Sequence, residues 1–264
     1  MNESEKRELG ATLVALSDSK LLLGYHYGEW TFGPPAIEAG IAACSMAQEE
    51  YGHARLLNGI LKREFGMETD PLADTRASEQ MAAIAFLDRP FGSWADLVAA
   101  NAVVDHALSL ELSAFEGGWE PLARVVPKML LEEKFHYAHA EGWVRLIETE
   151  GGETRPLLDR ALARALTAAA AFFGPPGHDA ELVSAGLKRT GDDDLRARLF
   201  RRVASLVAET EAAGLESHGG AWDLLEPPDW QGWDEERRRI EGGGPEQAML
   251  DELRGTKNVA FKTA

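Results

Sequence analysis

The sequence predicts an all-α protein built as a four-helix bundle with additional C-terminal helices. Ala, Leu, Glu and Arg are abundant and runs of β-branched residues are scarce, which favours helices over strands. Gly and Pro breaks, of which Gly33-Pro34-Pro35 is the clearest, divide the chain into long segments. Because long helices joined by tight breaks pack as antiparallel neighbours, the first four segments are expected to form two hairpins and hence a bundle.

Start and stop signals give the bounds of each expected helix. The Gly33 turn ends the first helix, and Gly66 and Gly151 end the second and the fourth, while Ser93 caps the start of the third. A looser segment, 67–92, separates the second helix from the third. The expected helices span residues 8–30, 36–65, 93–116, 121–149, 155–173 and 193–217. We therefore expect a bundle domain over 1–217 and a C-terminal tail over 218–264, which is a candidate for partner binding.

Composition and charge narrow the class of protein. The chain has 264 residues, of which 45% are hydrophobic. It can therefore bury a sizeable core that needs no disulfide or metal ion for its stability. Its single cysteine, Cys44, excludes an internal disulfide and fits a reducing compartment. No stretch approaches the ~20 apolar residues of a membrane-spanning helix, and the first residues lack the apolar run of a signal peptide. The net charge of −17 argues against nucleic acid and anionic lipid as partners. We expect a cytoplasmic protein.

Two clusters of arginine stand out against this acidic background. One comprises Arg196, Arg198, Arg201 and Arg202, and the other Arg237, Arg238 and Arg239. We interpret both as solvated helix faces, since a charge run usually lies on the polar side of a helix. The alternative is that these arginines bind a phosphate-bearing ligand or partner.

A Glu-Glu-x-x-His motif occurs twice, in the second and the fourth expected helices. The copies are Glu49-Glu50-Tyr51-Gly52-His53 and Glu132-Glu133-Lys134-Phe135-His136, which lie 83 residues apart. In each copy the second Glu and the His are three residues apart, so both side chains lie on one helix face, about a turn apart. This spacing allows a carboxylate oxygen and an imidazole nitrogen to reach the same metal ion.

Both motifs lie within apolar stripes that should face the core of the bundle. Buried carboxylates are costly unless they are paired or bound to metal, whereas a surface ion pair would lie on the polar face. The stripe around Glu50 and His53 contains Ala43, Met46, Ala47, Ala54 and Leu57, and the stripe around Glu133 and His136 contains Met129, Leu130, Ala140, Val144 and Ile147. The pattern therefore favours a buried metal site.

Two further carboxylates are expected from the first and third helices, at matching heights in the hairpins. Glu50 lies ~21 Å along its helix, and Asp18 lies ~18 Å before the end of the first helix, at 1.5 Å per residue. In the second hairpin Asp105 matches the height of Glu133, and Glu111 is the alternative, closer to the helix end. Asp18 precedes Glu50 by 32 residues, and Asp105 precedes Glu133 by 28.

The expected site thus has six ligands for two metal ions. Two Glu-x-x-His units joined by one carboxylate from each of the other two helices define the carboxylate-bridged centre of ferritin-like bundles. Hard carboxylates with one imidazole per metal suit iron, with manganese as the alternative. No organic cofactor is expected, because the chain lacks a phosphate-cradling glycine loop. The six predicted ligands are Asp18, Glu50, His53, Asp105, Glu133 and His136.

At these residues the chain resembles the phenylacetyl-CoA epoxidase subunits, a ferritin-like family of bacterial multicomponent oxygenases. The resemblance covers roughly residues 10–215 and leaves out the tail. The motifs that carry the resemblance are Leu16-Ser17-Asp18, Gly28-Glu29-Trp30, 47–55 (Ala-Gln-Glu-Glu-Tyr-Gly-His-Ala-Arg), 132–136 (Glu-Glu-Lys-Phe-His) and 142–146 (Gly-Trp-Val-Arg-Leu).

The resemblance implies a di-iron oxygenase subunit that inserts oxygen into an aromatic acyl-CoA ring in phenylacetate catabolism. It also implies a separate reductase and a homologous ferritin-like subunit, or a second copy, as partners. Within the family, the di-iron site belongs to a catalytic subunit, and a scaffold subunit has a related fold with eroded ligands. The length of the chain and the 142–146 motif are similar to those of the scaffold subunit, whereas the two retained Glu-x-x-His pairs are similar to those of the catalytic subunit. Asp18 stands where a catalytic subunit usually has Glu. The alternatives are a non-catalytic scaffold subunit and a ferritin-like iron-handling or oxidase protein.

Overall fold

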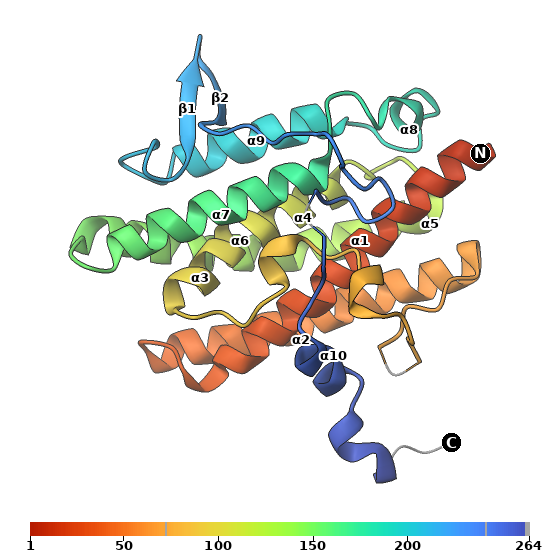
Figure 1. Cartoon of the computed structure of the whole chain (residues 1–264), viewed down its shortest axis with the longest axis horizontal. Coiled ribbons are helices and arrows are strands. Elements are labelled where there is room, and N and C mark those ends of the chain that lie inside the picture. Colours follow the sequence, from red (N-terminus) through yellow and green to blue (C-terminus); the bar gives the residue numbers. More distant parts are fainter. Residues whose placement is uncertain (72, 241, 262–264) are drawn as a thin grey trace.

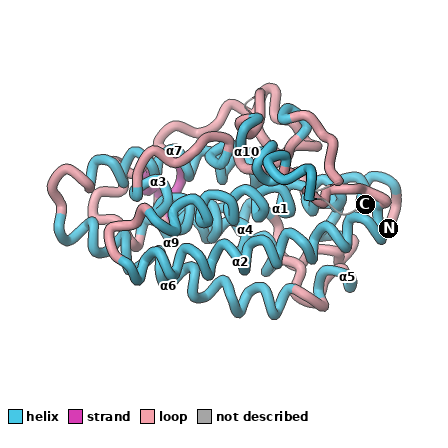
Figure 2. The backbone as a smooth tube through the Cα atoms, turned by 90° about the horizontal axis from the view of Figure 1, so that it is seen from below, coloured by secondary structure: helices cyan, strands magenta, loops and turns pink. Residues whose placement is uncertain are grey.

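The computed structural model describes residues 1–71, 73–240 and 242–261, and the bundle occupies the first part of the chain. Helix α1 (Glu3–Glu29) is joined to α2 (Ile37–Ile60) by the short turn η1 (Trp30–Phe32). The third rod of the bundle is α3 (Trp94–Ala99), η5 (Ala100–Asp105) and α4 (His106–Ser113) in succession. The fourth is α6 (Val126–Glu150), which follows the single turn α5 (Glu120–Ala123). Figure 2 shows α2 and α6 along one side of the molecule.

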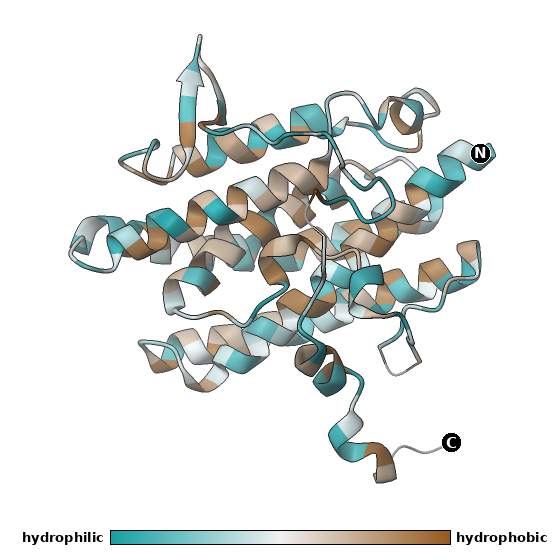
Figure 3. Ribbon diagram, in the orientation of Figure 1, coloured by the Kyte–Doolittle hydropathy of each residue, from teal (hydrophilic) through white to brown (hydrophobic). Residues whose placement is uncertain are grey.

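Two further helices cover the bundle on its other side. Helix α7 (Arg155–Phe173) packs against α3 and η5, and α9 (Asp192–Ala204) packs against α4 and α7 (Figure 1). The Ala- and Leu-rich face of α7 is buried, which continues the apolar interior seen in Figure 3. Among the described residues no helix is both long enough and apolar enough to cross a membrane. The remaining elements are η2 (Leu61–Phe65), η3 (Ser78–Gln80), η4 (Ala85–Leu87), α8 (Ala180–Ser184), β1 (Leu215–His218), β2 (Ala221–Leu224), α10 (Gln247–Leu253) and η6 (Thr256–Phe261).

The predicted all-α class is confirmed, and most expected helices appear near their expected bounds. The last one is an exception, because α9 ends at Ala204 and the expected helix over 193–217 is wrong in its second half. The chain turns instead into an antiparallel hairpin in which Leu215 pairs with Leu224. Its turn contains Gly219 and Gly220 at φ 60° and 88°, backbone angles that other residues rarely adopt.

The prediction of a solvated helix face is wrong for Arg238 and Arg239, of which only 2% is exposed. Arg238 donates from Nε to the carbonyl of Phe172 at 2.9 Å and from Nη2 to Asp192 at 2.6 Å. Arg239 forms an ion pair with Asp88. These arginines lie in an irregular segment rather than on a helix, so the helical-face argument does not apply to them. They hold the C-terminal segment against the bundle. Arg198 and Arg201 of the other cluster are exposed on α9, as expected.

A buried histidine attaches segment 67–92 to α1. His26 lies 2.9 Å through Nε2 from the carbonyl oxygen of Leu87, and its ring stacks on Phe91. Burial lowers the pKa of His26 to about 4. The hydrogen bond with the Leu87 carbonyl raises the pKa, but by less than burial lowers it.

Because the folded-state pKa of His26 lies below its ordinary value of 6.5, the unfolded chain binds the extra proton between about pH 6.5 and pH 4. The contribution of His26 to stability is therefore present above pH 6.5 and is lost as the pH falls towards 4. We expect His26→Gln to remove a slope of up to about 1.4 kcal/mol per pH unit from unfolding free energies measured by urea titration in this window. An unchanged pH profile in the variant would contradict the prediction.

Candidate functional site

Each of the four bundle rods contributes a charged side chain to one buried cluster. Helix α2 supplies Glu50 and His53, and α6 supplies Glu133 and His136, in each case within the expected apolar stripe. The third rod supplies Asp105, at the end of η5. This segment is a π-helical turn, a local widening of the helix that is frequent at functional sites. Helix α1 supplies Lys20, so the contribution of the first rod is a cation.

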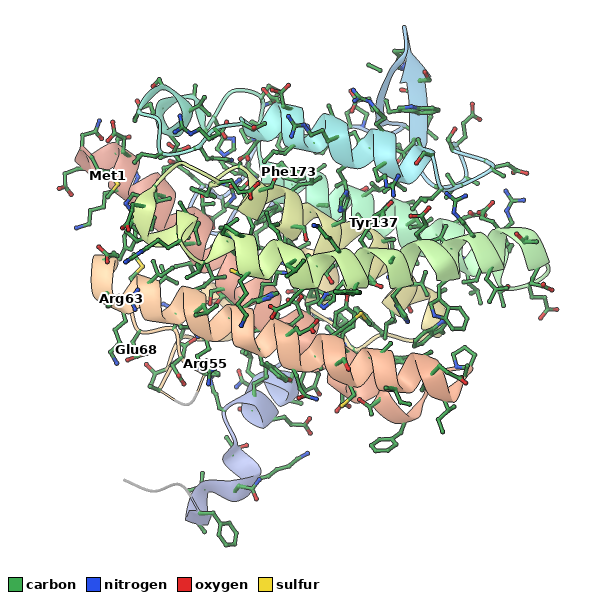
Figure 4. All side chains as sticks on the ribbon, turned by 180° about the vertical axis from the view of Figure 1, so that it is seen from behind. Met1, Arg55, Arg63, Glu68, Tyr137 and Phe173 are labelled. Carbon is green, nitrogen blue, oxygen red and sulfur yellow. The ribbon has the colours of Figure 1, made fainter. Side chains whose placement is uncertain are left out.

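The two Glu-Glu-x-x-His motifs are cross-linked through their first glutamates. Nε2 of His53 lies 2.7 Å from Glu132, and Nε2 of His136 lies 2.7 Å from Glu49. The two pairs run in opposite directions along the helices, so α2 and α6 are antiparallel at this point. The first Glu of each motif therefore orients the imidazole of the other helix, and the second Glu lies in the cluster itself. In Figure 4 these two helices lie in front.

The ammonium group of Lys20 lies at the centre of the carboxylates. Its Nζ is 3.0 Å from Glu50, 2.9 Å from Asp105 and 2.5 Å from Glu133. Burial alone would lower the pKa of Lys20, but the three carboxylates hold it well above its ordinary value. Lys20 is therefore charged at neutral pH, and it neutralises much of the negative charge that the bundle encloses.

Asp105 has four hydrogen-bond partners in and around the cluster, one of which is Lys20. The hydroxyl of Tyr27 donates to its Oδ2 at 2.8 Å, and His136 Nδ1 lies 2.9 Å from the same oxygen. Asn101 also donates to Asp105, at 3.4 Å. Burial alone would raise the pKa of Asp105, but Lys20 and His136 hold it well below its usual range. Asp105 is therefore ionised and orients the surrounding donors.

Both imidazoles have carboxylate oxygens near each of their nitrogens. His136 lies between Asp105 and Glu49, and His53 lies between Glu132 and Glu133, with Nδ1 3.2 Å from the latter. Burial lowers the pKa of a histidine, but these carboxylates raise the pKa of His136 to about 12 and raise that of His53. The His136 ring thus carries a proton on each nitrogen. Two cations, Lys20 and His136, then face the three central carboxylates, with His53 beside them.

Glu50 and His53 each have one buried polar atom without a hydrogen-bond partner among the described residues, and in His53 it is Nδ1. In Glu50 it is the second oxygen, Oε2. Burial raises the pKa of Glu50 to about 7, although Lys20 opposes the shift. One donor atom from each of Glu50, Asp105, Glu133 and His136 can be chosen so that all four lie within 4.8 Å of one another, close enough to hold a metal ion. A metal ion there would have to displace the ammonium of Lys20, and His136 would have to lose a proton.

The structure brings together five of the six predicted ligands and places Asp18 elsewhere. The carboxylate of Asp18 is bound by the guanidinium of Arg76, at 2.7 and 3.0 Å, and by the backbone amide of Ala82. Lys20 faces the cluster instead, because two residues along a helix correspond to a rotation of roughly 200°. The alternative ligand Glu111 is also elsewhere, in an ion pair with Lys188. Asp105 is thus the carboxylate that the third rod contributes.

Sequence reasoning missed Lys20, and two signals could have found it. Leu13, Leu16, Lys20, Leu23 and Tyr27 recur at helical spacing in α1, and all five are buried. Lys20 also precedes Glu50 by 30 residues, closer than Asp18 to the 28 residues between Asp105 and Glu133. The polar groups on the rim were missed as well, because nothing in a single sequence marks them. They include Tyr27 and Asn101, which donate to Asp105, and Ser109, which donates to Glu133.

A polar pocket of about 340 Å³ opens outside the cluster, between α2 and α6. It reaches the two cross-linking glutamates, Glu49 and Glu132, and the edge of His53. Lys128 and Arg55 also line it. The pocket is the nearest described opening from solvent to the buried cluster.

A four-helix bundle that encloses carboxylates and histidines from three of its four rods is typical of a ferritin-like protein. Comparison with known families agrees with this class. The profile of the Phenylacetic acid catabolic protein family matches residues 1–220, and the chain belongs to this family. One of the subunits of the 1,2-phenylacetyl-CoA epoxidase of Escherichia coli (strain K12) is 27% identical over 139 residues. That match spans 52% of this chain and 56% of the relative, so it covers about half of each protein.

Proposed function

We propose that this chain is the non-catalytic, ferritin-like subunit of a multicomponent oxygenase of the phenylacetyl-CoA epoxidase type. The position of Lys20 carries the proposal. Its ammonium contacts all three central carboxylates and performs the electrostatic task that metal cations perform in a di-iron bundle. The role of the chain is then to support a catalytic homologue that acts on the aromatic acyl-CoA, with electrons from a separate reductase.

Electrostatics supports this assignment in a second way. A metal ligand needs an unprotonated nitrogen, and the neighbouring carboxylates raise the pKa of both histidines, that of His136 to about 12. Loading two divalent ions would bring four positive charges to a cluster that Lys20 already neutralises in part. A metal ion held by the same three carboxylates would strongly repel the ammonium of Lys20 in the low-dielectric interior. The residues present therefore fit an internal ion network better than a two-metal centre.

The second candidate is the catalytic one, a subunit that binds iron itself. The grouping of Glu50, Asp105, Glu133 and His136 within reach of one ion favours it. Iron, or manganese in its place, would supply oxygen activation there. This candidate requires Lys20 to leave the centre and leaves α1 without a carboxylate ligand, since Asp18 is held by Arg76.

Metal content distinguishes the two candidates. We expect the full chain, expressed with iron or manganese supplementation, to contain well below one metal ion per chain by elemental analysis. Lys20→Glu supplies a fourth carboxylate from α1 and is expected to raise the metal content clearly, whereas Lys20→Gln supplies no carboxylate and serves as the matched control. Two iron ions per wild-type chain would overturn the proposal and favour the catalytic candidate.

A further inference from the structure

A long groove follows the outward face of α7. It consists of two adjoining cavities of about 630 and 530 Å³, and Ala163 and Arg164 of α7 line both of them. The other lining residues come from segments 85–96 and 212–240, which lie far from α7 in the sequence. Figure 1 shows the chain that follows β2 running past α7. We call the two cavities together the α7 groove, and none of its lining residues belongs to the buried cluster.

The groove is open because the α7 residues along it are small. Ala163, Ala168 and Ala171 line the larger cavity, where longer side chains would fill the space between α7 and the neighbouring segments. Phe86 and Pro228 add further apolar surface from those segments. Small-molecule sites are concave, mostly apolar, about 300–1,000 Å³ in volume, and contain a few polar groups that orient the ligand. The larger cavity has these properties.

The larger cavity also contains a surface on which a flat ring can stack. The guanidinium of Arg164 lies over the ring of Phe86, 5.3 Å from its centroid. A guanidinium is planar with two faces, and Arg164 is exposed, so one face is accessible to a ligand. Nucleobases bind proteins by stacking on aromatic rings and on arginine side chains in this way. The cavity therefore fits a ligand with a planar ring.

Arginine dominates the charge at the smaller cavity. Arg160 and Arg164 lie one turn apart on α7, and both line this cavity. Arg164 forms an ion pair with Asp96, whereas Arg160 forms no hydrogen bond or ion pair with any of the described residues. Guanidinium groups bind phosphate through two parallel hydrogen bonds, and such a site is a local exception in a chain of net charge −17. The smaller cavity therefore fits a phosphate group.

Two carboxylates of the larger cavity narrow the class of ligand further. Glu226 and Asp229 both line this cavity and are exposed. A carboxylate next to a bound phosphate is unfavourable, but it accepts hydrogen bonds from sugar hydroxyls, as an acidic residue does in dinucleotide-binding folds. The groove thus has matching groups for a base, a ribose and a phosphate.

We propose that the α7 groove binds a nucleoside diphosphate, with the base in the larger cavity and the diphosphate beside Arg160 and Arg164. Side-chain guanidinium groups hold the phosphates here, in place of the backbone amides of a glycine loop. A nucleic acid is excluded as the ligand, because an extended polyanion would be repelled by the negative field of the whole chain. The inference goes beyond the proposed function and does not depend on it, since the groove is separate from the buried cluster.

Isothermal titration calorimetry of the full chain with ADP tests the proposal. We expect a dissociation constant on the order of 1–100 μM, the range of a well-matched ligand of this size. Adenosine lacks the phosphates and pyrophosphate lacks the base, so each should bind at least about tenfold more weakly than ADP. A photoreactive azido derivative of ADP should label peptides from segments 85–89, 163–171 and 226–240.

Two variants assign the binding to the two parts of the groove. Arg160→Gln removes a guanidinium that has no structural partner, so it should weaken ADP binding about tenfold and leave adenosine binding unchanged. Ala168→Leu fills the larger cavity and should weaken the binding of ADP and of adenosine alike. The matched control is Arg198→Gln, which removes an exposed arginine of α9 outside the groove and should leave both affinities unchanged. Circular dichroism and thermal unfolding verify that each variant is folded.

Three outcomes would overturn the proposal. The first is a wild type that binds no ADP at millimolar concentrations. The second is an affinity for ADP that Arg160→Gln and Ala168→Leu lower no more than Arg198→Gln does. The third is pyrophosphate binding as tight as that of ADP, because the larger cavity would then contribute nothing. Metal content measured on the same samples reports on the proposed function, so the failure of one proposal is distinguishable from the failure of the other.

Discussion

Replacing Lys20 with Met is expected to lower the free energy of unfolding by about 3–5 kcal/mol, the typical cost of removing one partner from a buried ion network. The side-chain volumes are similar, so the effect arises from charge rather than from a cavity. Without the ammonium, Glu50, Asp105 and Glu133 would face one another in the interior with His136 as their main counter-charge. Urea or thermal unfolding monitored by circular dichroism measures the loss.

A double variant tests the cause of this effect. Lys20→Met combined with Glu133→Gln removes one positive and one negative charge, so it should recover part of the stability lost in the single variant. Lys62→Met is a suitable control, because Lys62 forms an exposed ion pair with Glu68, and exposed pairs contribute about 0–1 kcal/mol. If Lys20→Met were no more destabilising than Lys62→Met, Lys20 would not be the counter-charge of the cluster.

Replacing Lys188 with Met is expected to have an effect of similar size at a second buried ion network. The ammonium of Lys188 contacts Glu111 of α4 at 2.9 Å, Asp179 at 2.9 Å and Asp192 of α9. Arg238 from the C-terminal segment completes this second network by binding Asp192. Loss of Lys188 would leave three carboxylates with Arg238 as their main cation, so we expect a loss of about 3–5 kcal/mol in unfolding free energy.

The second network also predicts where the loss would be felt first. Hydrogen exchange should accelerate in α8, in α9 and in the segment around Arg238, because these elements meet at Lys188. Arg198→Met alters an exposed arginine of α9 and is the matched control. This account would be contradicted if Lys188→Met lowered the free energy of unfolding no more than Arg198→Met does. It would also be contradicted if hydrogen exchange in Lys188→Met became faster only in α2 and α6. The metal content is expected to stay unchanged, since Lys188 lies outside the first cluster.

Local patterns predicted much of this fold. The expected helix over 155–173 coincides with α7, and the Gly33-Pro34-Pro35 turn ends the first helix as predicted. Such features depend on periodicity and on breakers that act within a few residues. The hairpin after α9 and the buried Arg238 and Arg239 were not predictable in this way. The conformation of these arginines depends on contacts with Asp192, Phe172 and Asp88, which are distant in the sequence.

By itself the sequence determined the helical class, the two Glu-Glu-x-x-His motifs and the buried stripes in which Glu50, His53, Glu133 and His136 lie. These properties follow from spacing along a single helix, which any sequence displays directly. Only the tertiary structure decided that α1 turns Lys20 towards the cluster and Asp18 towards Arg76. The rotation of a helix about its axis is set by packing against partners far along the chain, and a change of two residues reverses which side chain faces inward. For this protein that rotation places an ammonium group where two metal ions were expected.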